Sequence, residues 1–487
     1  MGSIPIRLRH LCATMQLILV FFLTFYLILP APPLFALITL QEEEKIGREV
    51  LQEVSRNLEI LRDFEASAYV NQLGNLLVKK GVSFSPFQFR FFLIKDKTFN
   101  AFSVPGGYIF LNSGIFQYVE SEDELASILA HEMAHNLARH VAKRIETAKK
   151  MQIALTGATL AAILLGGGQA GQIVGITGTA LAHTKLLAYS REDEEEADRL
   201  GFEILTKTGF NPQAMSRIFE RLSRESSFAL ELNYRYLLTH PLPQERLNYL
   251  LNLVERYKIP HQDQYLLSND PLYFKRLKAK IRALSEDSSD LILTLKTQLR
   301  EKENPWLRYT LAMTLMQARF FKEAEVELKR ALSMLPSKDY FILDLAELQF
   351  NKGNYEEAQR LINTINFETS PLREILETKR KILLARTLLE RGNLRESYIL
   401  FKNLEDEKLL SQDPNFFYFY ALLCAKLDLL GESHFYFGRH YENRGDLKTA
   451  LFHYKKALSF LEKNSKIYLE AENKVRLFDR KEEKRKP

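Results

Sequence analysis

The sequence has only two cysteines and one tryptophan among 487 residues. Cys12 lies in an apolar N-terminal segment, so a chain that has lost this segment keeps Cys424 alone and forms no intramolecular disulfide. Cysteine usage therefore does not report the redox compartment, and any metal site must use ligands other than thiolates. The formal net charge of +6 is small for this length, which argues against nucleic acid as a partner.

The N-terminal segment shows the order of features that is typical of a secretory leader. Arg7 and Arg9 precede an apolar run over residues 15–29, three prolines follow, and Ala36 is a small residue suited to cleavage. An uncleaved N-terminal anchor is the alternative. We interpret residues 1–36 as a signal peptide (or anchor), which places the rest of the chain outside the cytoplasm.

A short motif, H-E-x-x-H, lies in a stretch with helical periodicity. Its two histidines, His131 and His135, are four positions apart and lie about 40° from each other on a helix, so both imidazoles can bind one metal ion. Glu132 lies about 100° round the same helix, where a general base for an attacking water belongs. We predict His131 and His135 as metal ligands and Glu132 as the catalytic base.

A third ligand is expected from the acidic segment 190–201. Glu194 and Asp198 share one helix face, so Glu194 can bind the metal while Asp198 accepts a hydrogen bond from a ligand imidazole. The alternatives are an ordinary solvated acidic face and ligation by His183. His140 is predicted to be a surface residue or a partner of a ligand, because on a continuous helix it would lie opposite the first histidine.

At this point the chain resembles the HtpX/BepA-type zinc metallopeptidases, bacterial relatives of the CAAX prenyl endopeptidases. Four motifs appear in the family's order over residues about 40–255. They are the strand and hairpin at Asn100–Gly114, the metal helix ending in H-E-M-A-H, the helix S-R-E-D-E-E-E-A-D-R-L-G, and Thr239-His240-Pro241 followed by Arg246.

The resemblance implies a gluzincin-type α+β peptidase domain that binds one Zn²⁺ per chain. In the BepA-like branch it further implies that His240 caps the zinc in a resting state. Arg246 would then help to stabilise the oxyanion of the reaction.

Two other segments of this domain carry expectations about substrate and membrane. The strand at residues 107–112 is expected to accept an extended peptide by β-augmentation, because two glycines leave its backbone accessible. Residues 152–182 carry no charge and are split by three consecutive glycines. We expect a hydrophobic lip over the metal helix there, with a membrane-dipping segment or a true span as alternatives.

From about residue 305 the sequence becomes a repeat. Ala312 and Ala346 are thirty-four positions apart, and so are Ala324 and Ala358, which is the period of tetratricopeptide repeats. Four such units are predicted, with a further helical element within residues 410–430. Their aromatic runs either line a concave binding surface or pack between repeats.

The predicted architecture is mostly α, with a gluzincin-type α+β peptidase domain followed by an α-solenoid. The ranges are 37–260 for the peptidase, 261–304 for a helical connector, 305–465 for the repeats and 466–487 for a charged, frayed tail.

The predicted function is that of an exported, periplasmic zinc metalloendopeptidase. The resemblance implies that it acts on misfolded or misassembled envelope proteins and that its repeats bind outer-membrane assembly machinery. The alternatives are a chaperone or assembly scaffold with a latent peptidase site, and a membrane-embedded protease. Peripheral membrane contact through residues 152–182 is left open.

Overall fold

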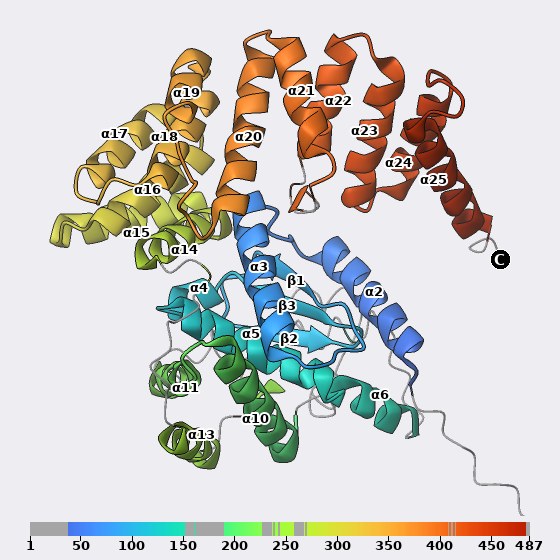
Figure 1. Cartoon of the computed structure of the whole chain (residues 1–487). Coiled ribbons are helices and arrows are strands. Elements are labelled where there is room, and N and C mark those ends of the chain that lie inside the picture. The colour runs from blue at the N-terminus through green and yellow to red at the C-terminus, as the bar shows by residue number, and fades with distance from the viewer. Residues whose placement is uncertain are drawn as a thin grey trace, which may run out of the picture.

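A computed structural model shows a first domain with a small sheet, over which an array of helices arches (Figure 1). The described residues are 38–150, 160, 189–225, 236, 239–241, 244–257, 267, 270–407, 409, 410, 413 and 415–483. The expected leader, nearly all of the uncharged segment 152–182, and His183 lie outside these residues. The predicted fold class, mostly α with an α+β first domain and a helical solenoid, is confirmed.

The first domain places a three-stranded sheet among helices, with α3 and α5 packed against the strands. The metal-helix motif lies on α5, and α10 runs beside it (Figure 1). The elements are α2 (Leu40–Asn57), α3 (Phe64–Gly81), β1 (Arg90–Ile94), β2 (Ala101–Val104), β3 (Tyr108–Asn112), α4 (Ile115–Tyr118), α5 (Glu122–Leu137), α6 (His140–Lys150), α10 (Arg191–Thr208), α11 (Gln213–Glu225) and α13 (Gln244–Arg256).

The sheet has the order β1-β3-β2, with β3 parallel to β1 and antiparallel to β2. Because β3 is paired on both sides, it has no free edge, and the prediction that this strand accepts a peptide is wrong. Gly106 and Gly107 serve the turn between β2 and β3, where both have positive φ. A Cβ on Gly107 would lie 2.9 Å from the carbonyl oxygen of Gln88, so the turn itself requires this glycine.

The helical array consists of antiparallel pairs. Residues with positive φ lie just after the ends of several of its helices: Arg319, Gly353, Gly392, Asp428 and Gly445. The small residues that set the predicted period are fully buried between helices. The helices are α14 (Pro271–Ser285), α15 (Ser288–Glu301), α16 (Pro305–Gln317), α17 (Phe321–Leu332), α18 (Asp339–Asn351), α19 (Tyr355–Ile362), α20 (Arg373–Glu390), α21 (Leu394–Leu404), α22 (Phe416–Lys426), α23 (Leu430–Asn443), α24 (Leu447–Leu458) and α25 (Lys466–Glu483).

The C-terminal part of the array differs from expectation in two respects. The segment predicted as a frayed tail forms α25 as far as Glu483, and its Ala471 and Phe478 are buried, so this helix covers the open end of the array. The aromatic side chains of residues 416–420 and 435–437 serve mainly as packing between repeats, because Phe416, Phe417 and most of the others are buried. Tyr418 is the most exposed of them.

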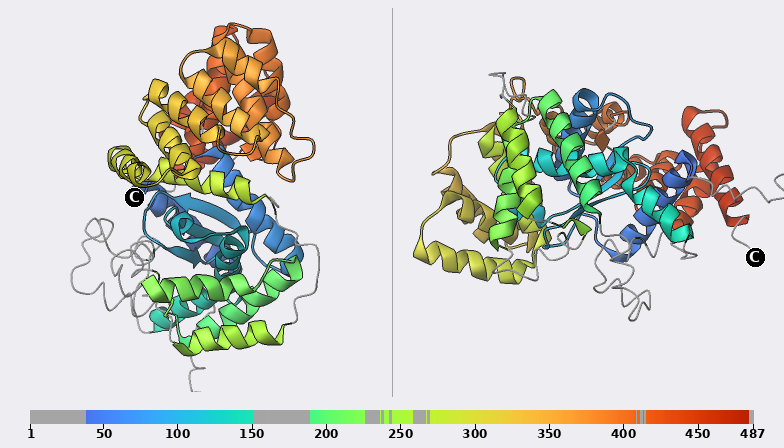
Figure 2. Two further views of the ribbon diagram at one scale, coloured as in Figure 1. Left: turned by 90° about the vertical axis from the view of Figure 1, so that its left-hand side faces the viewer. Right: turned by 90° about the horizontal axis from the view of Figure 1, so that it is seen from below.

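The two domains meet at the start of α3, which points into the array (Figures 1 and 2). Glu65 is fully buried there and accepts hydrogen bonds from Arg276 on α14 and from Lys379 on α20, the latter at 2.9 Å. Lys280 lies 3.2 Å from the same carboxylate. Arg276 also binds Asp344 on α18. One carboxylate of the first domain therefore binds two helices of the array directly, and Arg276 extends the contact to α18.

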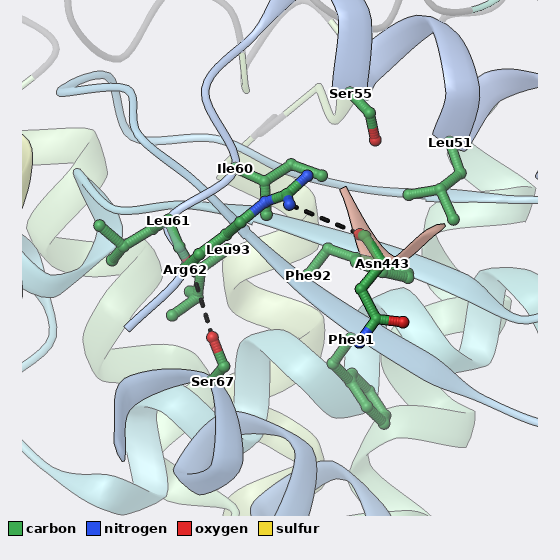
Figure 3. A pocket seen from close by; sticks show the side chains of 10 residues that line it. All are labelled: Leu51, Ser55, Ile60, Leu61, Arg62, Ser67, Phe91, Phe92, Leu93 and Asn443. Atoms are coloured by element: carbon green, nitrogen blue, oxygen red, sulfur yellow. Dashed lines mark hydrogen bonds between the residues drawn. The ribbon is translucent and has the colours of Figure 1, made fainter. Parts of the chain in front are cut away.

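A second contact lies further along the array. The side chain of Arg62 donates to the carbonyl oxygen of Asn443, at the end of α23, over 3.5 Å (Figure 3). The two residues border a cavity of about 180 Å³ that Leu51 of α2 and Phe92 of β1 also line. The array thus touches the first domain on both sides of the start of α3.

Among the helices of the described residues, none is long and apolar enough to cross a membrane.

The Glu65 junction predicts that the two domains are thermodynamically coupled. We expect Glu65→Gln to lower the free energy of unfolding by about 3 kcal/mol, because the substitution removes the buried negative charge that the cations on α14 and α20 share. Chemical unfolding of the full chain measures this. Glu59→Gln is the matched control, because Glu59 is exposed and pairs with Lys95 in solvent. Equal, small effects of both changes would refute the coupling.

The same junction predicts a pH dependence. Burial alone would raise the pKa of Glu65, but Arg276, Lys379 and Lys280 hold this pKa well below its usual range. Its stabilisation is therefore fully present above the unfolded-state pKa of about 4.3 and is lost as the pH falls below that value. The difference in stability between the parent and Glu65→Gln should shrink on acidification below about pH 4.

Candidate metal centre

Helix α5 carries the H-E-x-x-H motif in its last two turns, well inside the protein. Ser121 caps the helix by accepting a hydrogen bond from the backbone N–H of Glu124. All residues from Glu122 to Asn136 are buried, so both histidines and the glutamate face protein rather than solvent. Helix α10 begins with a capping box formed by Ser190 and Asp193.

Helices α5 and α10 approach each other closely because small residues lie between them. Ala130 and Ala134 on α5 and Ala197 on α10 are fully buried. A Cβ on Gly201 would lie only 3.3 Å from the backbone nitrogen of His131. This close approach brings the acidic face of α10 against the histidines of α5.

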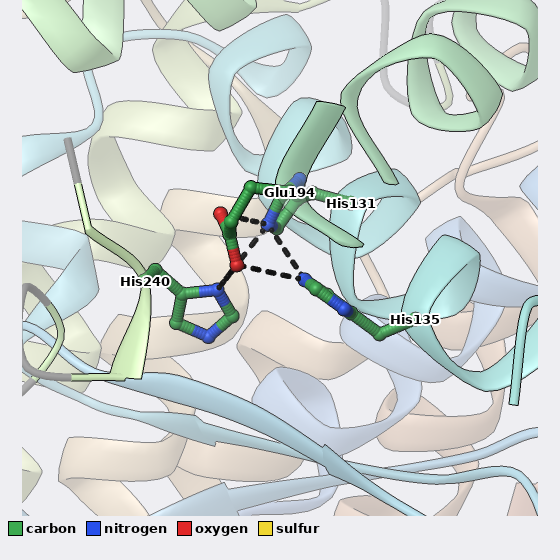
Figure 4. Close-up of side chains that lie close together, drawn as sticks. All are labelled: His131, His135, Glu194 and His240. Atoms are coloured by element: carbon green, nitrogen blue, oxygen red, sulfur yellow. Dashed lines mark hydrogen bonds and ion pairs between the residues drawn. The ribbon is translucent and has the colours of Figure 1, made fainter. Parts of the chain in front are cut away.

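Four side chains converge at this contact (Figure 4). The Nε2 atoms of His131 and His135 are 3.1 Å apart, and Oε1 of Glu194 lies 3.4 Å from Nε2 of His135. Nδ1 of His240 lies 3.0 Å from the same carboxylate oxygen. One ligand atom from each residue lies within 4.8 Å of the others.

The donor set fits a metal ion of the zinc type. Three imidazoles and one carboxylate, all buried, offer four nitrogen and oxygen ligands, the number that tetrahedral coordination requires. One ligand atom of each residue lies near the others, with the Nε2 atoms of His131 and His135 facing each other at 3.1 Å and the carboxylate of Glu194 beside them. A cation between them would satisfy these atoms.

Asp198 and Arg246 form the next layer behind the ligands. Oδ1 of Asp198 lies 3.1 Å from Nδ1 of His131, so Asp198 faces the ligand imidazole from the outer side. The guanidinium of Arg246 donates to both carboxylate oxygens of Asp198, at 2.6 and 2.8 Å, and also contacts Glu194. Arg246 is thus engaged by two carboxylates in this conformation.

Glu132 is fully buried, and its two carboxylate oxygens have no hydrogen-bond partner. Burial raises its pKa, so its affinity for a proton is higher than that of an ordinary glutamate. Nε2 of His240 lies 3.5 Å from Oε1 of this carboxylate. His240 therefore lies between Glu132 and Glu194.

The two histidines of the motif differ in their surroundings. Burial opposes the charge of both rings and lowers the pKa of His135 well below its usual value. For His131, hydrogen bonds to Asp198 and Glu194 outweigh burial and raise the pKa to about 9. The two pKa values differ because His131 has Asp198 beside it, whereas His135 lacks this carboxylate and the charges of His131 and His240 add to the effect of burial.

Three residues at the centre were missed in the sequence. Tyr189 stacks on the ring of His135 with centroids 3.8 Å apart, and Tyr236 stacks on His240 at 4.6 Å. Asn136 accepts a hydrogen bond from the backbone of Gly107 and so fixes the β2–β3 turn to the metal helix. Their contacts cross between distant segments, so no local pattern indicates them, although Asn136 directly follows the motif.

His140 is buried, and the continuous helix assumed for it ends earlier. Helix α5 stops at Leu137, and Arg139 adopts positive φ at a corner before α6. This corner turns the ring of His140 towards Nδ1 of His135, at 2.9 Å. Of the two options predicted for His140, the structure favours the partner of a ligand over the surface residue.

Comparison with known proteins agrees with this geometry. The model of peptidase family M48 matches residues 66–254, and a tetratricopeptide repeat model matches residues 315–370. The beta-barrel assembly-enhancing protease of Escherichia coli (strain K12) is 31% identical over 356 residues, which cover 69% of each chain. The protein of the same name from Yersinia pestis is 32% identical over 316 residues.

The Yersinia pestis match covers 63% of either chain, so this chain spans less than two thirds of that relative. The mitochondrial metalloendopeptidase OMA1 of Schizosaccharomyces pombe is 30% identical over 156 residues, 32% of this chain and 43% of that protein. The chain belongs to peptidase family M48, a family of metallopeptidases. Within it, the chain is similar to the beta-barrel assembly-enhancing proteases, which confirms the resemblance inferred from its motifs.

The approach of α10 to α5 predicts the effect of a larger residue at position 201. We expect Gly201→Val to lower the free energy of unfolding by about 1–3 kcal/mol, because the branched side chain would collide with the backbone of α5. The substitution should also weaken metal binding by moving Glu194. Arg199→Val, at an exposed position of the same helix, controls for helix propensity. Metal affinity and thermal unfolding of both variants test this, and wild-type affinity in Gly201→Val would contradict it.

Proposed function

We propose that the chain is a zinc-dependent metalloendopeptidase whose site is closed in the conformation described here. The convergence of His131, His135 and Glu194 beside the buried Glu132, whose carboxylate has no hydrogen-bond partner, is the observation that supports this best. When bound, zinc would polarise the peptide carbonyl and acidify a water molecule.

In this proposal the side chains have separate tasks. The two motif histidines and Glu194 hold the metal, and Asp198 fixes the tautomer of His131. Glu132 takes a proton from the attacking water and delivers it to the nitrogen of the leaving amine. Burial raises its pKa, which favours the step in which it accepts the proton.

Arg246 has two roles in the proposal, one for each conformation. In the closed form it orients Glu194 and Asp198, the two carboxylates that it contacts. To stabilise an oxyanion, the role that the family resemblance implies, its guanidinium must leave one of these carboxylates and turn towards the substrate. Opening of the site would therefore change the partners of Arg246.

His240 serves as the cap. Its ring lies within 3.0 Å of Glu194 and 3.5 Å of Glu132, which is the space that a water molecule and a substrate carbonyl must enter. Tyr236 stacks on the ring, and the backbone carbonyl of Thr239 accepts a hydrogen bond from Tyr189. Moving this segment would expose the ligands and the general base together.

We further propose that the protein acts in the periplasm on misfolded or misassembled envelope proteins. The name of its relatives, beta-barrel assembly-enhancing protease, supports a role beside the outer-membrane assembly machinery. The repeats, which present surfaces suited to partner proteins, would provide the contact. A chaperone or scaffold with a latent peptidase is the second candidate, favoured by the occupation of the site by His240.

Glu132→Gln tests the catalytic role. We expect this variant to bind zinc like the parent and to lose about 10²–10⁴-fold in the rate of cleavage of an unfolded model protein, because it lacks only the proton acceptor. Glu195→Gln, on the exposed face of α10, is the matched control. Cleavage by Glu132→Gln at the parental rate would exclude Glu132 as the base.

His240→Ala tests the cap. Removal of the ring should raise basal proteolysis about tenfold for each 1.4 kcal/mol by which the closed form is favoured. Initial rates on the same unfolded substrate, at equal zinc content, measure the change. A rate equal to or below that of the parent would contradict the capping role and favour the scaffold.

A further inference from the structure

The two motif histidines are supported on their outer sides by different groups. His131 has the carboxylate of Asp198 at Nδ1, over 3.1 Å. His135 has no carboxylate at the corresponding atom, since its Nδ1 faces Nδ1 of His140 at 2.9 Å. His140 is fully buried and in turn lies 3.1 Å from Glu196 through its Nε2 atom. The rings of His135 and His140 and the carboxylate of Glu196 therefore form a hydrogen-bonded series that leads away from the metal centre.

We propose that His140 is a positioning residue that fixes the tautomer and orientation of His135 for metal binding. The inference rests on the proposed zinc site. Nε2 of His135 faces Glu194 and His131, so this atom must be unprotonated to bind a metal. Its proton then lies on Nδ1, which donates to His140.

The contact between His140 and Glu196, at the outer end of this series, requires the same proton positions. A carboxylate only accepts hydrogen bonds, so Nε2 of His140 carries a proton and donates to Glu196. Asp193 adds a second oxygen 3.6 Å from the same nitrogen. With its proton on Nε2, His140 has a free lone pair on Nδ1, which accepts from His135. Only this assignment gives each contact one donor and one acceptor.

The backbone corner before His140 is held from outside the metal helix. Arg139 has φ of 57°, which is uncommon for a residue with a side chain. Its guanidinium donates to the buried carboxylate of Glu43, at 2.7 Å, and to the backbone carbonyl of Ile38. The start of α2 thereby fixes the corner that aims His140 at its partner.

His140 does not serve as a further ligand. The nitrogen nearest the centre is already bound to the outer side of His135, and His140 is absent from the group of side chains that converge on a common point. Its place matches that of the outer residues that orient metal-binding imidazoles, whose loss commonly costs about 10- to 100-fold in metal affinity.

Two substitutions distinguish the effect of the hydrogen bond between His135 and His140 from the effect of the volume that the His140 ring fills. His140→Leu keeps an apolar volume but removes the acceptor, whereas the amide oxygen of His140→Asn takes the place of Nδ1 and accepts from His135. We expect His140→Leu to lose about 10- to 100-fold in Zn²⁺ affinity, measured by competition with a chelator, and His140→Asn to stay within a few-fold of the parent. Glu196→Gln should weaken binding slightly, and Glu195→Gln should not.

Co²⁺ substitution adds a readout that a purely structural role would not change. The visible d–d absorption of the Co²⁺-loaded protein reports ligand geometry, so it should shift in His140→Leu and stay parental in His140→Asn. A folded His140→Leu with parental affinity and spectrum would overturn the proposal. So would an equal loss in both variants, because that would trace the effect to packing.

A measurement on the parent covers the case in which His140→Leu does not fold. In zinc-loaded protein labelled with ¹⁵N-histidine, His140, assigned by the signal lost in His140→Asn, should carry its proton on Nε2. A proton on Nδ1 instead would overturn the proposal. A parent that binds neither Zn²⁺ nor Co²⁺ would count against the proposed metallopeptidase itself, which distinguishes the two failures.

Discussion

The close approach of α10 to α5 is the contact on which the metal centre depends. Two helices can place their side chains on one metal ion only if their axes come near at the right turn, and here Gly201 and the alanines around it allow this. The backbone of α5 at His131 then packs directly on α10, which sets Glu194 and Asp198 at fixed distances from the ring. The geometry of the site therefore depends on small residues that take no part in its chemistry.

Much of this architecture can be predicted from the sequence, because the patterns that indicate it are local and periodic. The spacing of His131 and His135, the shared face of Glu194 and Asp198, and the thirty-four-residue period of the alanines each follow from the geometry of one helix. The structure gathers the residues of these patterns as predicted, and His240 and Arg246 join them as the resemblance implied.

What the sequence could not give depends on contacts between distant segments. The place of β3 in the middle of the sheet is decided by strand pairing over long range, so the edge strand was misassigned. The role of His140 depends on one backbone corner at Arg139, which breaks the helix that the periodicity extends. The sequence of helix α25 resembles a charged tail, because its buried residues Ala471 and Phe478 are few among many polar residues.

The junction at Glu65 has a consequence for how such proteins vary in length. A repeat array ordinarily gains or loses units easily, because each repeat touches only its neighbours. Here α14 and α20 place side chains at one carboxylate of the first domain, and α18 is linked to it through Asp344 and Arg276. A unit inserted or deleted among these helices would move the side chains out of register. Relatives that differ in repeat number should therefore differ beyond α20, towards the end that α25 covers.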